Sequence, residues 1–380
     1  MKISLCMILW NEAKSIERLI RSAQPFVSEV VVGVDRGSTD GTREIVKRLG
    51  CRVLETRLSE ELAVQKSVDS DPEWGFSKAR NLVLGACDPN AWHLILDGHE
   101  RFLHGEQLAA EVDTAIAAGC DAVAVTVTSE PGKDGISTLV YDSTRVLAPT
   151  VRYSNPLHNA PNAKKKYRSR SIVVERWKSD QADDARHARN VQRAACNIAG
   201  FQKIVEKEPK NARAWYYLAT AYKESARWAD AVKAFEECLK HSVWNEERWN
   251  ARVEAARCWF GLSNHVEARE QLAAALDEQP ERAEAHYYLG DLAYKLRHFR
   301  EAELWLERCV AMPMPNCRLF LNKRIYLVNR HDALSLVYSH LGKYGQAIEQ
   351  AELALKAAPN GRIEKNISIW KTRVSNGTCP

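Results

Sequence analysis

The 380-residue sequence contains no apolar run that approaches the roughly 18 residues with which a helix crosses a membrane. The apolar run at residues 3–10 is also too short for a secretory signal, and no small-residue cleavage site follows it. The ten cysteines include no Cys-x-x-Cys pair, which argues against a zinc site, and most of them occur in periodic apolar stretches. These absences predict a protein of a reducing, cytoplasmic compartment without a membrane span.

The charge of the chain is modest as well. Its formal net charge is +5, with 45% hydrophobic and 27% charged residues, as in an ordinary soluble protein. A length of 380 residues suggests about two domains. A small positive charge suits phosphate-bearing ligands, but no stripe of basic and aromatic residues indicates nucleic acid.

The first 125 residues alternate between short apolar strands and helices. Strands are predicted at residues 3–9, 29–34, 52–55 and 93–96, with helices between them at residues 13–23, 41–49 and 77–86. This alternation is typical of βαβ units and a parallel sheet. Further strands are predicted at residues 122–129, 138–141, 144–147 and 172–175. Residues 148–170, which contain three prolines and the basic run at 164–170, are predicted to form a loop or lid.

From about residue 180 onward the pattern is helical and repeats itself. Small and aromatic residues recur at the spacing of tetratricopeptide repeats, with starts near residues 212, 249, 283 and 328 and intervals of 37, 34 and 45 residues. The last interval holds an insertion at residues 313–327. At least about three such repeats form a continuous solenoid. We therefore predict an α/β domain at residues 1–178, a linker helix at 179–211 and a repeat domain with a capping helix at 212–380.

Carboxylates follow two of the predicted strands. Asp35 ends the second strand, and the tetrapeptide Asp-Gly-His-Glu at residues 97–100 follows the strand at 93–96. Asp40 is expected to fix the turn after Asp35. In an open α/β sheet the carboxyl ends of the strands are the edge at which ligands bind. This edge is therefore the predicted site for a nucleotide and a cation.

Four motifs occur in one order along the chain: Met-Ile-Leu-Trp-Asn-Glu-Ala at residues 7–13, Asp-Arg-Gly-Ser-Thr-Asp-Gly-Thr at 35–42, Phe-Ser-Lys-Ala-Arg-Asn at 76–81 and Leu-Asp-Gly-His-Glu at 96–100. In this the chain resembles the family-2 glycosyltransferases of the GT-A fold, in the branch with tetratricopeptide repeats behind the catalytic domain. The resemblance covers nearly the whole chain. It implies an α/β, nucleotide-sugar-binding GT-A domain, with a mostly parallel sheet and flanking helices, followed by an all-α tetratricopeptide solenoid.

The resemblance also implies a divalent cation that neutralises the diphosphate. The family has Asp-x-Asp after the fourth strand, whereas this chain has Asp97 and His99. Related enzymes that glycosylate polypeptides carry Asp-x-His with the histidine as a metal ligand, and imidazole favours Mn²⁺ over Mg²⁺. His158 matches a further histidine of this branch, although Asn159 replaces the usual glutamate. Alternatively, His99 is a loop residue of a metal-free or degenerate site and His158 is structural. Glu100 either caps a following helix or positions a ligand or water.

The resemblance places several residues in the donor pocket. Asp35 would hydrogen-bond the base and Arg80 would lie near the uridine and diphosphate. The family's other donor-side positions correspond to Trp10, Asn11, Glu12 and Asp97. The alternatives are that Asp35 caps its turn, that Trp10 only packs, and that Arg80 is a surface residue of a helix.

The general base is the least defined part of the site. An inverting transfer needs a carboxylate to deprotonate the acceptor. Glu130 after the strand at 122–129 and Asp142 are candidates by position, with Glu130 preferred, and Glu100 is a further candidate. Family resemblance implies inversion, although the Asp-x-His motif is shared with retaining enzymes.

The leading hypothesis is a metal-dependent hexosyltransferase that uses a nucleotide diphosphate sugar, first of all a UDP-sugar. Its acceptor would be a protein or peptide, or else a glycan, because solenoids offer concave surfaces for peptides; the repeats would bind the acceptor or pair two subunits. A second hypothesis is a virus-type enzyme that glycosylates a hydroxymethylated base in DNA, with the basic run at residues 164–170 as its DNA contact. A third is an inactive transferase domain with a scaffold built on the repeats.

Overall fold

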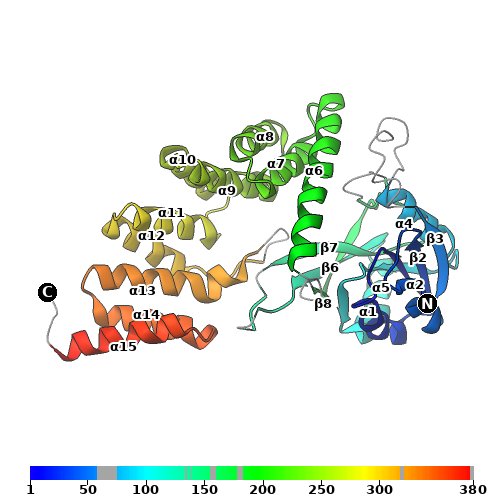
Figure 1. Ribbon diagram of the computed structural model, residues 1–380, viewed down its shortest axis with the longest axis horizontal. Helices are drawn as coiled ribbons and strands as arrows, with labels where there is room; N and C mark the ends of the chain where they lie inside the picture. Colours follow the sequence, from blue (N-terminus) through cyan, green and yellow to red (C-terminus); the bar gives the residue numbers. More distant parts are fainter. Residues whose placement is uncertain are drawn as a thin grey trace. The chain divides into compact units, whose positions relative to one another are not determined.

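The protein is described by a computed structural model (Figure 1). The structure describes residues 1–57, 75–132, 135–137, 139–154, 160–177, 183–316 and 321–376. Two compact units divide the chain. The sheet unit comprises Met1–Glu130 and Tyr141–Gly200, and the repeat unit comprises Pro131–Val140 and Phe201–Pro380. The domain boundaries predicted above stay a prediction.

The sheet unit contains an eight-stranded sheet in the order β3-β2-β1-β4-β7-β6-β8-β5. Its strands are β1 Ile3–Leu9, β2 Glu29–Asp35, β3 Arg52–Thr56, β4 Trp92–Ile95, β5 Glu100–Leu103, β6 Ala122–Ser129, β7 Val140–Leu147 and β8 Lys166–Arg176. Strands β1 to β4 are mutually parallel, β6 is parallel to β8, and β7 and β5 run antiparallel to β4 and β8. The predicted mostly parallel sheet is therefore confirmed, and the carboxyl ends of β1, β2 and β4 share one edge.

Helices cover both faces of this sheet. They are α1 Ile16–Ala23, α2 Thr42–Arg48, α4 Phe76–Gly85 and α5 Leu108–Ala117, with short 3-10 turns at Gln24–Phe26 and Gly105–Gln107. In α1 the buried residues recur at helical spacing and pack with Leu5 and Met7 of β1 in one apolar cluster, to which α2 and α5 also contribute. Cys6 points to the opposite face, where it packs with Val83 of α4. Successive side chains of β1 therefore pack into two apolar clusters, one on each face of the sheet, as expected for a strand that is buried on both faces.

The predicted loop or lid at residues 148–170 is wrong in its last part, because Lys166–Arg176 form β8. β8 lies between β6 and β5 in the sheet, and its buried residues Ser169, Ile172 and Val174 are interspersed among basic side chains. Lysine and arginine obscure this pattern in the sequence, so the strand resembles a charged loop. The two strands predicted at 138–141 and 144–147 are one strand, Val140–Leu147.

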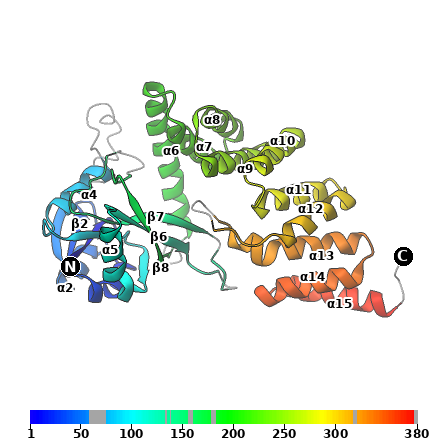
Figure 2. The same cartoon turned by 180° about the vertical axis from the view of Figure 1, so that it is seen from behind.

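The remaining helices follow one another along the chain as α6 Asp183–Lys207, α7 Ala212–Glu224, α8 Trp228–His241, α9 Asn245–Gly261, α10 His265–Glu278, α11 Ala283–Lys295, α12 Phe299–Ala311, the π-helix η4 Ile325–Asn329, α13 Arg330–His340, α14 Tyr344–Ala357 and α15 Gly361–Ser375. Each of α7 to α14 packs on its sequence neighbour, and α15 packs on α14 (Figures 1 and 2). This is the predicted all-α solenoid with a final capping helix. Within the part of the chain that the structure describes, no helix is long and apolar enough to cross a membrane.

The turn inside each helix pair repeats the spacing found in the sequence. Ala226, Ser263, Arg297 and Gly342 have φ angles of 56°, 58°, 62° and 76°. These left-handed positions are separated by 37, 34 and 45 residues, as the predicted repeat starts are. A left-handed residue after a helix closes its last turn, so the four pairs share one way of reversing the chain. The 45-residue interval includes the insertion that leads to η4.

We predict that His93 makes the stability of the sheet unit sensitive to acid. His93 lies in β4, is 1% exposed, and neither ring nitrogen has a hydrogen-bond partner among the described residues. Burial, helped by the nearby Arg152, lowers the pKa of His93 to about 4. As the pH is lowered, the unfolded chain therefore binds a proton at His93 near pH 6.5, whereas the folded protein binds it only near pH 4. The free energy of unfolding consequently decreases as the pH falls through this interval, by about 2 kcal/mol between pH 7 and pH 5.

Urea denaturation of the wild type and of His93→Gln at pH 7 and pH 5 measures this effect. The glutamine variant is expected to lose about 2 kcal/mol less than the wild type over this interval, because glutamine does not titrate. Equal losses in the two proteins would contradict the assignment to His93.

Candidate functional site

A tight turn follows β4 at the carboxyl edge of the sheet. The backbone N–H of Asp97 donates to Oε2 of Glu100 at 2.8 Å, and the N–H of Glu100 donates to the carbonyl oxygen of Asp97 at 2.9 Å. Gly98 lies between them, where an added Cβ would come within 2.6 Å of Cγ of Glu12 and 2.9 Å of a methyl group of Leu9. Glycine is therefore needed here because the turn packs closely against the end of β1.

Two arginines hold the Asp97 carboxylate. Arg80 of α4 places Nη2 at 2.8 Å from Oδ1, and Arg145 of β7 places Nη1 at 3.4 Å from Oδ2. Arg145 also places Nη2 at 2.6 Å from Oε1 of Glu100. Burial would raise the pKa of Asp97, but the guanidinium groups of Arg80 and Arg145 override it and hold the pKa well below its usual range. Asp97 is thus an ionised carboxylate at any physiological pH.

Glu100 has a different electrostatic environment, although it shares Arg145 with Asp97. Its side chain is completely buried, and burial raises its pKa to about 7; Arg145 opposes the rise and the Asp97 carboxylate adds to it. Glu100 begins strand β5, so its interpretation as a helix cap is wrong. It instead braces the turn between Asp97 and Arg145.

A second layer supports Arg80. Its Nη1 donates to the hydroxyl of Tyr153 at 3.2 Å, and its guanidinium carbon lies 5.0 Å from the centre of the Tyr153 ring. The neighbouring Asn81 exchanges two hydrogen bonds of 2.9 Å with the backbone of Tyr153. Helix α4 is therefore fixed to the segment after β7. This arrangement contradicts the alternative that Arg80 is an exposed surface residue, since its side chain is only 14% exposed.

His99 lies beside a third arginine. Its Nε2 is 3.4 Å from Nη2 of Arg176, and its carbonyl oxygen accepts a hydrogen bond of 2.8 Å from the N–H of Trp177. Nη1 of Arg176 donates to the hydroxyl of Tyr141 at 3.3 Å. His99 is thus held at the end of β8 and is not a free loop residue.

The loops after β1 and β2 are joined by hydrogen bonds. Asn11, which has a φ angle of 54°, accepts a bond of 2.9 Å at Oδ1 from the N–H of Thr39. The N–H of Glu12 donates to Oγ1 of Thr42 at 2.8 Å. The side-chain oxygen of Asn11 therefore shapes the loop pair. Glu12 also accepts from Ser15 Oγ at 3.1 Å and lies against Gly98.

The aspartates after β2 divide between two tasks. Asp40 accepts from the N–H and the hydroxyl of Thr42 at 3.1 Å and 2.5 Å and from the N–H of Ala13 at 2.9 Å, which fixes the turn as the sequence predicts. Asp35 is fully buried at the tip of β2 and accepts from the N–H of Gly37 at 2.8 Å. Trp10 is 43% exposed at the same edge.

The candidate bases lie further along the sheet. Glu130 follows β6 directly, is partly exposed, and its N–H donates to the carbonyl oxygen of Arg176 at 2.8 Å. Asp142 forms an ion pair of 2.6 Å with Arg168. His158 and Asn159 lie outside the described residues.

The sequence interpretation missed Arg145, Arg176 and Tyr153. Arg145 has the strongest signal, since it is a single basic residue within the apolar end of a predicted strand, where an unpaired charge would be costly. Its partners, however, are 45 and 48 residues away in the chain. Local patterns do not identify such pairs.

The charges of the site sum to a positive value. Arg80, Arg145 and Arg176 outnumber the carboxylates of Asp97 and Glu100, and burial leaves Glu100 partly protonated near pH 7. Among the described residues, the Nε–H groups of all three arginines have no acceptor. These Nε–H groups are buried, so it is the surplus of positive charge, rather than these donors, that suits an anion such as a diphosphate. For a cation, the site offers Asp97 and His99, and no group of three His, Cys, Asp or Glu forms within the described ranges.

Comparison with known families agrees with this geometry. Residues 4–172 match the family model of glycosyl transferase family 2. Four stretches match models of the tetratricopeptide repeat: residues 201–233, 218–278, 267–314 and 331–360. The first match covers β1 to most of β8, and the others cover the helices from the end of α6 to α14.

Individual relatives are more distant. A TPR repeat-containing protein of Synechococcus elongatus is 29% identical over 162 residues, which are 41% of this chain and 34% of that protein. The chain thus spans about a third of the curated relative it matches. The crystal structure of MamA is 16% identical with a TM-score of 0.38 over 47% of this chain and 95% of that one. YrrB, a TPR protein with an unusual peptide-binding site, is 16% identical with a TM-score of 0.36 over 47% and 83%.

We predict that Arg145→Met destabilises the protein by about 3–5 kcal/mol, because it leaves the buried carboxylate of Glu100 without its cation. The matched control is Arg168→Met on the neighbouring part of the sheet. Its ion pair with Asp142 is partly exposed, at 32% and 12%, so its loss is expected to cost less than about 1 kcal/mol. Urea denaturation at pH 8 measures both, and losses of similar size would contradict a special role for Arg145.

Proposed function

Because the chain consists of a family 2 glycosyl transferase domain followed by tetratricopeptide repeats, we propose that it transfers a hexose from a nucleotide diphosphate sugar to an acceptor. A UDP-sugar is the first choice of donor. The observation that carries the proposal is the position of Asp97 between Arg80 and Arg145, at the edge where β1, β2 and β4 end. Ligands of open α/β sheets bind at this edge.

The donor base would be held by the loops after β1 and β2. Asp35 is buried and already fixed by the N–H of Gly37, so its carboxylate presents a rigid acceptor to a base N–H. Trp10 is the exposed aromatic ring at the same edge, where it can stack on the base. The hydrogen bonds between the two loops hold this pocket before a donor arrives.

The leaving diphosphate gains negative charge as the sugar departs. Arg80 and Arg145 are held in place by Asp97, Glu100 and Tyr153, so they need no rearrangement when that charge develops. Preorganised positive groups of this kind lower the barrier because the site, unlike water, does not have to reorient. Asp97 would thus orient the arginines as well as balance their charge.

A divalent cation, Mn²⁺ before Mg²⁺, belongs to the proposal as a second counter-charge. Asp97 and His99 would hold it, with His158 as the predicted third ligand. The fit rests on one carboxylate and one imidazole that lie on the same turn, and the imidazole favours Mn²⁺. When bound, such an ion would neutralise phosphate oxygens.

The acceptor hydroxyl would lose its proton to Glu130, which follows β6 at the edge of the sheet. Asp142 is a weaker candidate, because its carboxylate is engaged with Arg168 at 2.6 Å. A base on the far side of the sugar from the leaving group implies inversion.

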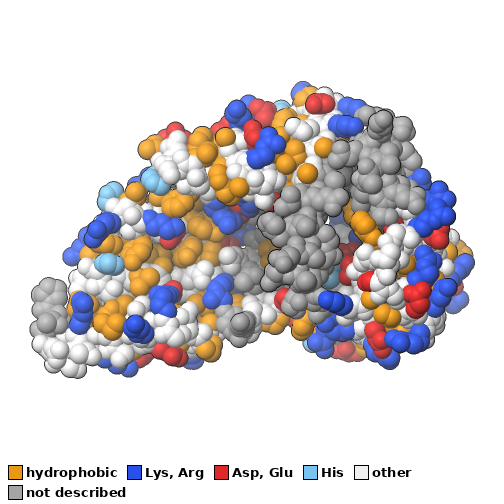
Figure 3. Space-filling model, in the orientation of Figure 1, with side chains coloured by type: hydrophobic (Ala, Val, Ile, Leu, Met, Phe, Trp, Pro, Cys, Tyr) orange, Lys and Arg blue, Asp and Glu red, His pale blue; other side chains and the backbone are white. Residues whose placement is uncertain are grey.

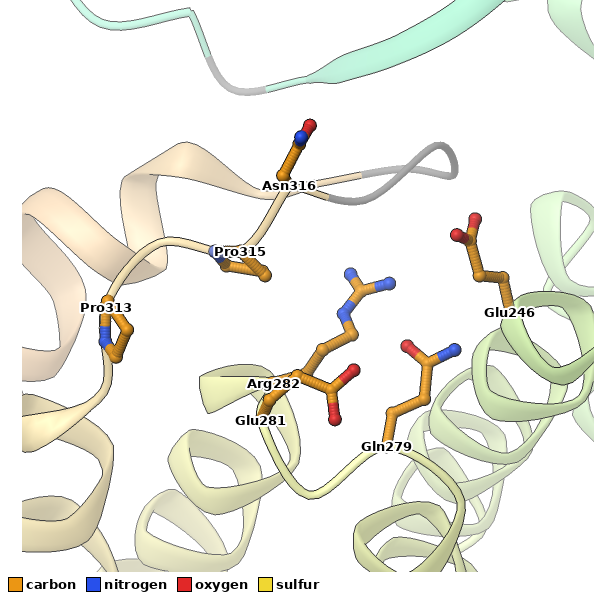
Figure 4. A pocket seen from close by; sticks show the side chains of 7 residues that line it. All are labelled: Glu246, Gln279, Glu281, Arg282, Pro313, Pro315 and Asn316. Atoms are coloured by element: carbon orange, nitrogen blue, oxygen red, sulfur yellow. The ribbon is translucent and has the colours of Figure 1, made fainter.

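The repeat unit would supply the acceptor surface, and a peptide or protein is preferred to a glycan. Its face in Figure 3 presents hydrophobic side chains between lysines and arginines. A cavity of about 270 Å³ lies among the connections between helix pairs and is lined by Glu246, Gln279, Glu281, Arg282, Pro313, Pro315 and Asn316. Figure 4 shows Arg282 directed into it, with the amide of Gln279 beside it.

DNA is a weaker choice of acceptor. Much of the basic run that would contact it is part of β8, and Arg168 is paired with Asp142. The backbone N–H groups of Lys164 and Lys165 bind the carboxylate of Asp121 at 2.8 Å and 2.9 Å. Pairing of two copies through the repeats stays a prediction.

We predict that the protein releases nucleotide diphosphate from at least one donor in a panel of UDP-, GDP- and dTDP-hexoses with Mn²⁺, and that EDTA lowers the rate. Asp97→Asn is expected to reduce turnover on the order of 100-fold, because Arg80 and Arg145 lose the charge that orients them. The control is Asp88→Asn, which removes a partly exposed carboxylate paired with Lys2 and is expected to leave turnover unchanged.

Three outcomes separate the hypotheses. No release from any donor, with no thermal shift on adding nucleotide, supports the inactive scaffold and contradicts the enzyme. Unchanged turnover in Asp97→Asn contradicts the assigned site. Binding to duplex DNA that falls steeply with salt, rather than salt-insensitive peptide binding, would favour a DNA acceptor.

A further inference from the structure

The connection between β6 and β7 is part of the repeat unit. The sheet unit ends at Glu130, the chain passes through Pro131–Val140 within the repeat unit, and the sheet unit resumes at Tyr141. The two units are therefore joined at three points along the chain, because the boundary is crossed again between Gly200 and Phe201. Two of these crossings flank the segment that follows the candidate base.

We call Pro131–Val140 the anchor segment; of its residues, the structure describes 131–132, 135–137 and 139–140, and among these it pairs Gly132 with Ile136. The N–H of Gly132 donates to the carbonyl oxygen of Ile136 at 3.0 Å, and the N–H of Gly135 donates to that of Gly132 at 2.9 Å. Pro131 and Ser137 form an antiparallel bridge. Gly135 has a φ angle of 75°, which a residue with a side chain rarely adopts. The pairing of Gly132 with Ile136 and of Pro131 with Ser137 therefore holds the backbone of Ile136 in a defined position where the turn closes.

Ile136 belongs to the core of the repeats. It is 7% exposed and forms part of the apolar cluster of α11 to α15, together with Leu306, Val328 and Tyr338. Burying an isoleucine stabilises the folded unit because it removes a large apolar surface from water. A polar side chain at position 136 would lose this contribution and place an unsatisfied group in the cluster.

A second attachment lies at Val140. Val140 and Leu321 exchange both backbone hydrogen bonds as an antiparallel pair, at 3.2 Å and 2.8 Å. Val140 also packs against the apolar cluster that contains Ile325 and Tyr326 of η4. The hydroxyl of Tyr326 accepts from the N–H of Ala283 at 3.1 Å, so the receiving surface is fixed to α11. Rare π-helical turns such as η4 are often found at functional positions.

Along the chain, the anchor segment is flanked on both sides by residues of the candidate site. Glu130 immediately precedes it, and Tyr141, which accepts a hydrogen bond from Arg176, immediately follows it. Five residues after Val140, the same strand carries Arg145 to Asp97 and Glu100. The position of the anchor segment therefore constrains the candidate base at one end and the arginine strand at the other.

We propose that Ile136 and the Val140–Leu321 pair make the repeat unit a positioning part of the transfer site, which acts through Glu130 and β7. The proposal rests on the proposed function and goes beyond it, because it gives the repeats a role in the chemical step besides acceptor binding. Ile136 is then a positioning residue, and its loss lowers turnover while donor binding is retained.

The test compares Ile136→Asn with Ile136→Val and with Ile369→Asn, which changes an exposed isoleucine of α15 in the same unit. With UDP-glucose or the best donor of the panel, Ile136→Asn is expected to lower kcat about tenfold and leave the donor KM within about twofold, as for a misplaced catalytic group. Hydrogen exchange in peptides covering residues 123–130 and 141–147 is expected to rise about tenfold. Neither control should change. Unchanged kcat and exchange in a folded Ile136→Asn protein would overturn the proposal.

A cross-link provides a rescue. Directly opposed antiparallel residues that exchange both hydrogen bonds have Cα atoms about 5.5 Å apart, which a disulfide can span. Adding Val140→Cys and Leu321→Cys to Ile136→Asn, then oxidising with glutathione disulfide, should restore kcat, and dithiothreitol should remove the gain. A cross-link that forms without restoring kcat would overturn the proposal.

Failure of the proposed function would be recognised separately. If the wild type releases no nucleotide from any donor, the transferase assignment fails. Hydrogen exchange of the backbone amides of residues 123–130 then decides by itself whether the repeats position Glu130. Raised exchange in Ile136→Asn supports positioning, and unchanged exchange overturns it.

Discussion

The ion pairs of Asp97 with Arg80 and Arg145 are the interaction on which the rest of the site depends. They join three segments that are distant in the chain: α4, the turn after β4, and β7. Each partner is largely buried, so none can be removed without leaving a charge in a poorly hydrated place. The surplus of arginine over carboxylate then makes this edge of the sheet suited to an anion. The donor diphosphate assigned to it is consistent with the family 2 glycosyl transferase match.

The same strand links the site to the repeats. β7 begins in the repeat unit at Val140 and carries Arg145 to the ion pairs within the sheet unit. Boundaries between domains usually fall in exposed linkers across which few contacts form. Here the repeat unit contains Pro131–Val140, which lies within the stretch that matches glycosyl transferase family 2, and a buried isoleucine and a pair of backbone hydrogen bonds hold it there. The chain therefore passes between the two units three times, and two of these crossings flank residues 131–140.

Sequence patterns predicted the strands and helix repeats that depend on local periodicity. The strands that end at Leu9 and Asp35 follow from short apolar runs, and the repeat intervals recur as left-handed turns in the helix pairs. The patterns did not predict features that depend on contacts between residues distant in the chain. Arg145 is paired across strands, and β8 hides its inward residues between lysines and arginines. The packing of Ile136 in the core of the repeats was also not predicted, because a short segment with glycines resembles any hairpin loop until its apolar partners are known.

The central claim is that the arginine cluster around Asp97 binds the donor diphosphate. Isothermal titration of UDP and of uridine tests it directly, in the wild type and in Arg80→Met, at equal Mn²⁺. The account predicts that UDP binds the wild type at least about tenfold more tightly than uridine, a difference of about 1.4 kcal/mol, and that Arg80→Met removes most of this difference while uridine affinity is unchanged. Equal affinities for UDP and uridine in the wild type, or a difference that Arg80→Met leaves intact, would contradict it.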